Sequence, residues 1–452
     1  MKDISKVRFE ALAGYCRMPQ TLFYAEEIQW LQSRNEDVLI IVIRDRADDD
    51  FSAILLARDL RLRYRWIDMT TFFESPAAAL AAVEPKVAVA ISDLDNQRVQ
   101  GDEKGKPIDF FTSIVAAEKL HPDFVHLNTI EGYSPAKELI TPMMRWYEDA
   151  DGNFIEQFQT TGFDARMWEL YLFAMLVEAG YALDRDQPIP DFSAKGLLGE
   201  MCIEATTVNP TRDRSGAIVP PPTAESQEQL LEIQRQYLPI KFAGPLTAKL
   251  GKRYWERPNV QGRPLVLAIQ DFHAPTSMTM SRTALPVYLY GYVHDWEHQA
   301  DGKLVITPHK VTSHRLGSKE VQSGFFGLPG ADNISAVIAN TSATISKFNR
   351  MGVVAGFGSK RVRLIRRGLA TDLDPNASVP KPFVADVNSP GYRESWIEGM
   401  DVYHNPNALH PLLPEMLPGA GHHFIEQDGQ LRSLVPEWQP LSSMTHILVP
   451  EP

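Results

Sequence analysis

Three acidic residues stand in positions where their side chains can do chemistry together: Glu169, Asp191 and Glu204. Glu169 lies inside the apolar run 163–179, which predicts a buried helix. Because burying even a neutral polar group without a partner costs roughly 2–7 kcal/mol, a carboxylate there needs a hydrogen-bonded partner, a cation or a metal ion. A structural ion pair with Arg166 is the alternative explanation.

The other two carboxylates flank a predicted hairpin. Asp191 follows Pro190 and begins a strand, and Glu204 ends the apolar run 201–203. A hairpin that brings them together, with Glu169 added from a packing helix, makes an all-oxygen pocket suited to Mg²⁺ or Mn²⁺. A turn aspartate at 191 and a solvent-facing strand end at 204 are the plainer interpretations.

This order of residues resembles the PD-(D/E)XK nuclease superfamily, which has the restriction-endonuclease-like fold. The family pattern is an acid on a helix, Pro-Asp on a strand and Glu-X-Lys on the next strand. Glu169, Pro190-Asp191 and Glu204-Ala205-Thr206 match those positions, within about residues 160–270. The resemblance implies phosphodiester hydrolysis, with a metal held by Asp191 and Glu204. Glu169 is then expected to orient a ligand or water, or to hold a second ion.

The sequence departs from the family at Thr206, which stands where the family has a lysine that helps to activate water. The family tolerates moving this lysine to a nearby element. Lys249 is the first candidate and Lys241 the second, both on a helix expected to pack beside the strand of Glu204. An ordinary solvated lysine is the alternative for each.

The length, charge and cysteine content of the chain exclude some classes of protein. The chain has 452 residues, a formal net charge of −12 and two cysteines, Cys16 and Cys202. The negative charge argues against non-specific coating of nucleic acid, and two cysteines exclude a disulfide framework. The N-terminus shows no signal-peptide core and no apolar run is long enough to span a bilayer, so we expect a cytoplasmic protein without membrane contact.

Nucleic acid binding would require a local basic face. The run 360–367 predicts a strand with Arg361, Arg363 and Arg367 on one side, and Lys249, Lys252 and Arg253 form a second basic group. Together these side chains suit phosphate contacts. A solvated edge strand protected by its charges is the plainer alternative for the first group.

The segment pattern predicts an α/β (α+β) protein of three regions. Residues 1–150 form a β-rich α+β domain with an antiparallel meander, a capped helix at 75–83 and helices at 110–120 and 135–148. The short apolar run 86–92 predicts a further buried strand, with a helix as the alternative. Residues 151–300 form the restriction-endonuclease-like core, a mixed sheet with helices on both faces. Residues 301–452 extend or cover that core, and from about residue 404 the chain is expected to wrap the surface.

Other polar groups offer weaker candidates for chemistry. Asp271 and His273 follow the predicted strand 265–269 and can approach the same pocket, although a structural histidine is the plainer interpretation. The histidines at 404, 410, 422 and 423 match no zinc-binding spacing and are expected on surface loops. No G-x-S-x-G motif supports a serine nucleophile.

The sequence therefore favours a Mg²⁺- or Mn²⁺-dependent nuclease, with DNA as the expected partner. One alternative is a nuclease-fold protein without activity that binds nucleic acid or protein. The other is a metal-dependent hydrolase of small molecules. We expect the N-terminal domain to serve recognition or sensing, or to bind a second copy or a protein partner.

Overall fold

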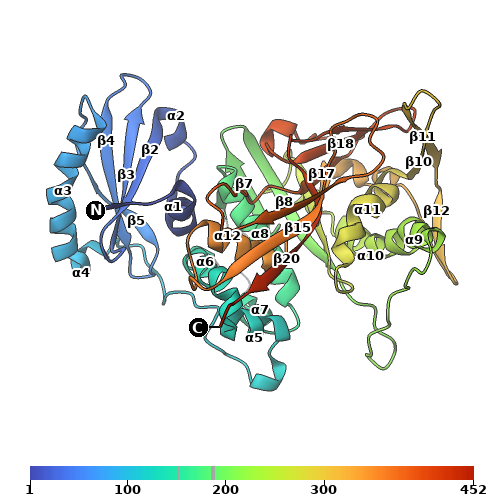
Figure 1. The fold of residues 1–452 in the computed structure, drawn as a ribbon, viewed down its shortest axis with the longest axis horizontal. Helices are drawn as coiled ribbons and strands as arrows, with labels where there is room; N and C mark the ends of the chain where they lie inside the picture. The colour runs from blue at the N-terminus through green and yellow to red at the C-terminus, as the bar shows by residue number, and fades with distance from the viewer. Residues whose placement is uncertain (148, 150–151, 185–188, 452) are drawn as a thin grey trace.

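A computed structural model describes residues 1–147, 149, 152–184 and 189–451 of the chain. Figure 1 shows an N-terminal sheet at one end, a central mixed sheet flanked by helices, and a smaller sheet of late strands beside the centre. The predicted α/β class is confirmed. No helix within the described ranges has both the length and the apolar character needed to cross a membrane.

The N-terminal sheet has the order β1-β2-β3-β4-β5, and all its pairs are antiparallel, as the predicted meander requires. Its strands are β1 (Lys2–Asp3), β2 (Ala25–Gln32), β3 (Val38–Asp45), β4 (Phe51–Arg58) and β5 (Tyr64–Met69). Alternate side chains face opposite ways. Val38, Ile40 and Val42 therefore pack on helix α3 (Pro76–Ser92), whereas Leu39 and Ile41 pack towards α1 (Lys6–Ala13) and the rest of the molecule.

The predicted strand at 86–92 is wrong, because these residues continue α3. The helix begins at Ser75, whose hydroxyl accepts a hydrogen bond from the Ala78 amide at 3.3 Å. Val83, Val87 and Ala90 recur at helical spacing and are buried against the sheet. The alternating Val and Ala residues of this run mimic a strand pattern, and packing on the sheet favours the helix.

The predicted helix at 110–120 is also wrong; within it the structure has only a 3-10 turn, Ala117–Lys119. The Asp109 carboxylate accepts hydrogen bonds from the amides of Phe111 and Thr112, which competes with helix formation. Gln159 then holds the segment in place by donating to the carbonyls of Phe110 and Thr112. The predicted helix at 135–148 is present as α6 (Ser134–Met144), and residue 148 lies outside the described residues.

The central sheet has eight strands in the order β19-β18-β17-β14-β9-β8-β7-β6. Its strands are β6 (Ala182–Asp184), β7 (Phe192–Gly196), β8 (Gly199–Val208), β9 (Leu265–Asp271), β14 (Ala336–Asn340), β17 (Met400–His404), β18 (Gly421–Ile425) and β19 (Leu431–Leu434). β6, β7 and β8 form an antiparallel meander, and β9 is parallel to both β8 and β14. β9 is buried along its whole length, as expected for an apolar strand covered on both faces.

Helices cover both faces of this sheet. On one face α8 (Phe163–Glu178) and α12 (Ile345–Val354) share a core with Ile203, Ala268 and Ile338. On the other, α10 (Leu238–Leu250) and α11 (Ser281–Tyr290) pack on Cys202, Leu267 and Val337. The remaining α-helices are α2 (Thr21–Tyr24), α4 (Leu94–Gln97), α5 (Pro122–Thr129), α7 (Phe154–Gln159) and α9 (Gln227–Glu232).

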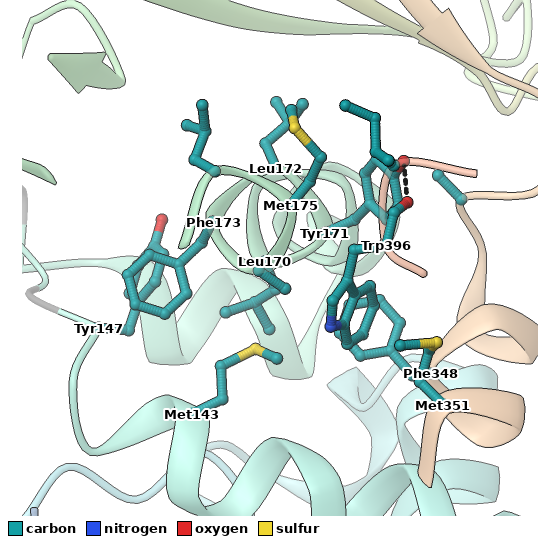
Figure 2. Close-up of a cluster of buried hydrophobic side chains, with 14 of the residues drawn as sticks. Met143, Tyr147, Leu170, Tyr171, Leu172, Phe173, Met175, Phe348, Met351 and Trp396 are labelled. Carbon is teal, nitrogen blue, oxygen red and sulfur yellow. Dashed lines mark hydrogen bonds between the residues drawn. The ribbon is translucent and has the colours of Figure 1, made fainter. Parts of the chain in front are cut away.

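The core around α8 is shared by distant segments (Figure 2). Met143 of α6 lies against Leu170, and Phe348 and Met351 of α12 lie beside Trp396. α6 therefore packs in the same core as α8 although it precedes residue 150. The boundary near residue 150 stays a prediction, and residues 150 and 151 of that segment lie outside the described residues.

The late part of the chain is more ordered than the sequence indicates. It contains two hairpins and a three-stranded antiparallel sheet in the order β16-β15-β20. The hairpins are β10 (Tyr292–His298) with β11 (Leu304–Lys310), and β12 (Ser313–Leu316) with β13 (Lys319–Gln322); the sheet is β15 (Arg363–Ala370), β16 (Lys381–Asp386) and β20 (Pro440–Leu448). The expectation that residues beyond 404 only wrap the surface is wrong, because β18 and β19 extend the central sheet.

Candidate active site

The β7–β8 hairpin places Asp191 and Glu204 side by side. Phe192 pairs with Ile203, so Asp191 stands opposite Glu204 at the open end of the hairpin. The Asp191 amide donates to Glu204 Oε2 at 3.3 Å, and the Ala205 amide donates to Asp191 Oδ2 at 2.7 Å. Main-chain donors therefore orient one oxygen of each carboxylate.

Two side chains from the α10 segment complete the surroundings of Glu204. Lys249, in the last turn of α10, places Nζ 2.5 Å from Glu204 Oε1. The hydroxyl of Tyr254, just beyond the helix, donates to the same oxygen at 2.7 Å. The Glu204 side chain is 7% exposed, so both contacts are largely shielded from water. Charge-assisted hydrogen bonds of this kind are stronger than neutral ones and fix the carboxylate firmly.

Burial and the neighbouring carboxylates make ionisation of Asp191 unfavourable. Desolvation by the surrounding protein, followed by the charges of Glu204 and Glu169, raises the pKa of Asp191 to about 8, and Lys249 opposes this only in part. Burial and Glu204 also raise the pKa of Tyr254, which keeps that phenol protonated as a donor. A cation bound beside Asp191 would relieve the repulsion that raises its pKa.

Glu169 reaches this region from the opposite face of the sheet, where α8 packs. Arg166 Nη1 donates to both of its carboxylate oxygens at 2.8 Å, and the Tyr147 hydroxyl donates to Oε2 at 3.0 Å. Glu169 raises the pKa of Asp191 through space, which places it within electrostatic reach. Glu169 therefore makes the ion pair with Arg166 that the sequence offered as the alternative to a metal site.

The donor chemistry of the hairpin fits a hard divalent cation. Asp191 and Glu204 offer carboxylate oxygens, and the pKa of Asp191 is raised by desolvation and then by the charges of Glu204 and Glu169. Within the described part of the chain, no group of three or more His, Cys, Asp or Glu side chains is arranged to hold a metal ion together. Of the three predicted ligands, the structure brings Asp191 and Glu204 together on the hairpin, whereas Glu169 is held by Arg166 and Tyr147.

The structure distinguishes between the two candidate lysines. Lys249 contacts Glu204 directly, whereas Lys241 Nζ donates to the Asn209 carbonyl at 2.8 Å and to Thr211 Oγ1 at 2.9 Å. Thr206 lies on β8 two residues beyond Glu204 and hence on the same face. The sequence analysis missed Tyr254 and Tyr147. Tyr254 lies a few residues after Lys249, at the end of the same run of cationic residues. This short distance from Lys249 in the sequence was the signal that could have identified it.

The other candidate groups form separate clusters. His273 Nδ1 lies 2.6 Å from Asp271 Oδ1, and no hydrogen bond or ion pair between described residues joins that pair to Asp191 or Glu204. His404 and His422 are buried and share a hydrogen bond of 2.9 Å; burial and His422 lower the pKa of His404 to about 3. His423 lies 2.9 Å from Asp401, and His410 is exposed. The placement of these histidines on surface loops is thus wrong for three of the four.

The predicted basic strand is present from Arg363 onward as β15, and Arg361 lies in the turn before it. Because β15 is the central strand of its sheet, the edge-strand alternative is wrong. Arg361, Arg363 and Arg367 are exposed, whereas Arg366 points inwards and binds Glu398 at 2.6 Å. Arg361 also lies 3.4 Å from Glu131. Arg253 pairs with Glu256 at 2.5 Å.

No protein-family model, curated protein or solved structure matches this chain.

Proposed function

We propose that this protein is a metal-dependent phosphodiesterase acting on nucleic acid, a DNA endonuclease of the PD-(D/E)XK type. The observation that carries the proposal is the contact of 2.5 Å between Lys249 Nζ and Glu204 Oε1, next to Asp191 on the same hairpin. Lys249 thereby supplies, from the following helix, the cation that Thr206 lacks.

The order of elements around the hairpin supports this proposal. A helix with an acid, α8, precedes the antiparallel strands that carry Pro190-Asp191 and Glu204, and α10 then leads to β9 beside β8. The helix that carries the acid thus comes first, the Pro-Asp segment second and the strand that carries Glu204 third, in space as well as in sequence. This local order of elements supports the proposal.

Each side chain has a role in the proposed reaction. Asp191 and Glu204 hold Mg²⁺ or Mn²⁺, which when bound supplies a water of lowered pKa and neutralises charge on the scissile phosphate. Lys249 and Tyr254 fix Glu204, and the Lys249 ammonium offers positive charge to the phosphate. Glu169, held by Arg166, adds to the negative field at Asp191 and strengthens its attraction for a cation.

Nucleic acid is the substrate class that suits the exposed cations. Arg363 and Arg367 take part in no ion pair with the described residues, and Lys252 beyond α10 is likewise exposed. Such side chains are suited to phosphate contacts. The N-terminal sheet is the proposed recognition, dimerisation or partner-binding domain. The free cysteines Cys16 and Cys202 suit the reducing cytoplasm.

One structural observation favours the alternative of an inactive nuclease-fold binding module. Both Glu204 and Glu169 already have a cationic partner, Lys249 and Arg166, and ion pairs of this kind neutralise carboxylates without a metal. A small-molecule hydrolase remains the second alternative, and it shares the same carboxylates.

Cleavage assays separate these functions. Labelled single- and double-stranded DNA and RNA are incubated with wild type, Asp191→Asn and Lys249→Met, with Mg²⁺, Mn²⁺ or EDTA. We expect metal-dependent cleavage by the wild type, none by Asp191→Asn and a loss of at least about 100-fold in Lys249→Met. Lys310→Met, an exposed lysine at the end of β11, is the matched control and should cleave as the wild type does. If none of the four substrates is cut with either metal, the nuclease proposal is wrong.

A further inference from the structure

A cavity lies away from the hairpin, beside the late three-stranded sheet. Its volume is about 720 Å³, within the range of small-ligand sites. Its walls come from β16, from residues 389–398, from Arg366 on β15 and from Val7 on α1. None of its lining residues belongs to the candidate active site.

A buried group of charges lies against this cavity. Lys347, Arg350 and Arg366 surround Glu394 and Glu398, and all five side chains are at most 9% exposed. Lys347 Nζ lies 2.8 Å from Glu394 Oε1, and Arg350 donates a hydrogen bond of 2.9 Å to each oxygen of that carboxylate. Arg366 Nη1 lies 2.6 Å from Glu398 Oε1.

This group has three cations for two carboxylates, so it carries one surplus positive charge. In addition, Arg366 Nη2 is buried and has no hydrogen-bond acceptor among the residues that the structure describes. Glu178, a further carboxylate whose pKa responds to the charge of Lys347, makes no ion pair with it among the described residues, and desolvation raises the pKa of Glu178 to about 7. An uncompensated buried cation is costly, and an anion in the adjoining cavity would offset that cost.

Aromatic side chains form the rest of the wall. Phe383 and Trp438 meet edge to face with ring centroids 4.9 Å apart, and the Arg366 guanidinium lies 5.5 Å from the Phe383 centroid. Trp438 is 45% exposed and Val384 beside it 69%. A large exposed aromatic side chain at a cavity that also carries positive charge marks a site for a ligand that is both planar and anionic.

We propose that this cavity binds a nucleotide, with its base against Trp438 and Phe383 and its phosphate towards Arg366. A nucleotide unites a flat ring system with an anion, which are the two features that the walls complement. Arg393, exposed at the rim, adds a further cation. Of the three acids that line the cavity, Asp386 opposes it, whereas Glu394 and Glu398 are the partners of the buried cations. The ligand would contact Val7 of α1 and so connect the N-terminal domain with the late sheet. This site is independent of the proposed nuclease activity.

Calorimetric titration of the full-length protein tests the proposal. The probes are AMP, GMP and CMP, with adenosine and inorganic phosphate as half-ligands and a 5′-phosphorylated dinucleotide as the model of a strand end. We expect saturable binding of at least one mononucleotide and weaker binding of both half-ligands. Tighter binding of the dinucleotide would identify a strand end, rather than a free nucleotide, as the source.

Variants assign the binding to this cavity. Trp438→Ala should weaken nucleotide binding by about tenfold or more, the usual effect of losing a base-stacking side chain. Trp296→Ala, an equally exposed tryptophan on β10, is the control and should bind as the wild type does. Arg366→Met should abolish binding, but this substitution of a buried residue can also impair folding. The comparison of Trp438→Ala with Trp296→Ala therefore decides whether the nucleotide binds in this cavity. The proposal is overturned if no mononucleotide binds, if adenosine binds as tightly as AMP, or if the two tryptophan variants bind equally.

Discussion

Replacing Asp191 by asparagine should stabilise the protein at alkaline pH. The folded carboxyl holds its proton up to about pH 8, whereas the unfolded one loses it near its ordinary pKa of 3.8. Between these values the folded state binds more protons than the unfolded state, so the stability that Asp191 contributes falls as the pH rises through this window. The asparagine side chain cannot ionise, and its carbonyl oxygen can still accept the hydrogen bond from the Ala205 amide.

The size of the stabilisation expected for Asp191→Asn follows from the shift in the pKa of Asp191. Each pH unit above the ordinary pKa of 3.8 lowers the stability of the wild type by about 1.4 kcal/mol. At pH 7 the free energy that Asp191→Asn recovers therefore has an upper limit of about 4 kcal/mol. The Asp191 side chain is partly exposed, so solvent screening reduces this to roughly 2 kcal/mol. For a large domain that is a rise of about 4 °C in melting temperature.

The assay is a thermal melt of wild type and Asp191→Asn at pH 5, 6, 7 and 8 without divalent metal. The difference in Tm between the two proteins should be small at pH 5 and grow to about 4 °C at pH 7 and above. Glu200→Gln on β8, the other strand of the hairpin, is the control: salt bridges to Lys195 and Arg263 hold Glu200, and a hydrogen bond from Lys195 lowers its pKa, so the substitution should not become stabilising at high pH. A Tm difference that stays constant or shrinks between pH 5 and 8 would refute the argument that repulsion and desolvation at the hairpin control Asp191.

Two further substitutions test the packing around the site. Arg166→Met should destabilise the protein by about 3 kcal/mol, because Glu169 would remain buried without its cation, and adding Glu169→Gln should restore part of the loss in the same melt. Gly352→Ala should destabilise by about 3 kcal/mol, since the added Cβ would lie 2.2 Å from the Pro135 carbonyl oxygen where α12 crosses α6. Gly244→Ala, in the open middle of α10, should instead stabilise by about 0.5–1 kcal/mol, and equal melting shifts for the two glycine variants would contradict the close approach at Gly352.

The local patterns around the hairpin were sufficient to predict its geometry. Pro190-Asp191 and the apolar run before Glu204 define two strands whose pairing is set by sequence-local turns, and the hairpin register follows. Lys249 was also predictable, because a helix between two parallel neighbouring strands must pack back on them. Contacts within one supersecondary unit are thus available from the sequence.

Contacts between distant segments were not predictable in the same way. The partner of Glu169 includes Tyr147, which belongs to a segment before the expected domain boundary, and the environment of His404 depends on strand β18. The segment 86–92 has an alternating pattern that fits a strand, and only burial against the N-terminal sheet selects a helix. In each case tertiary packing decides between locally acceptable structures.

The claim that the hairpin carboxylates form a divalent-metal site is tested most directly by titrating Mn²⁺ into the protein and measuring bound metal by electron paramagnetic resonance. The wild type should bind Mn²⁺ saturably, more tightly at pH 8.5 than at pH 6.5, because protons compete for Asp191. Asp191→Asn should lose this binding, and Lys252→Met should keep it. Equal uptake of Mn²⁺ by the wild type and Asp191→Asn would contradict the account.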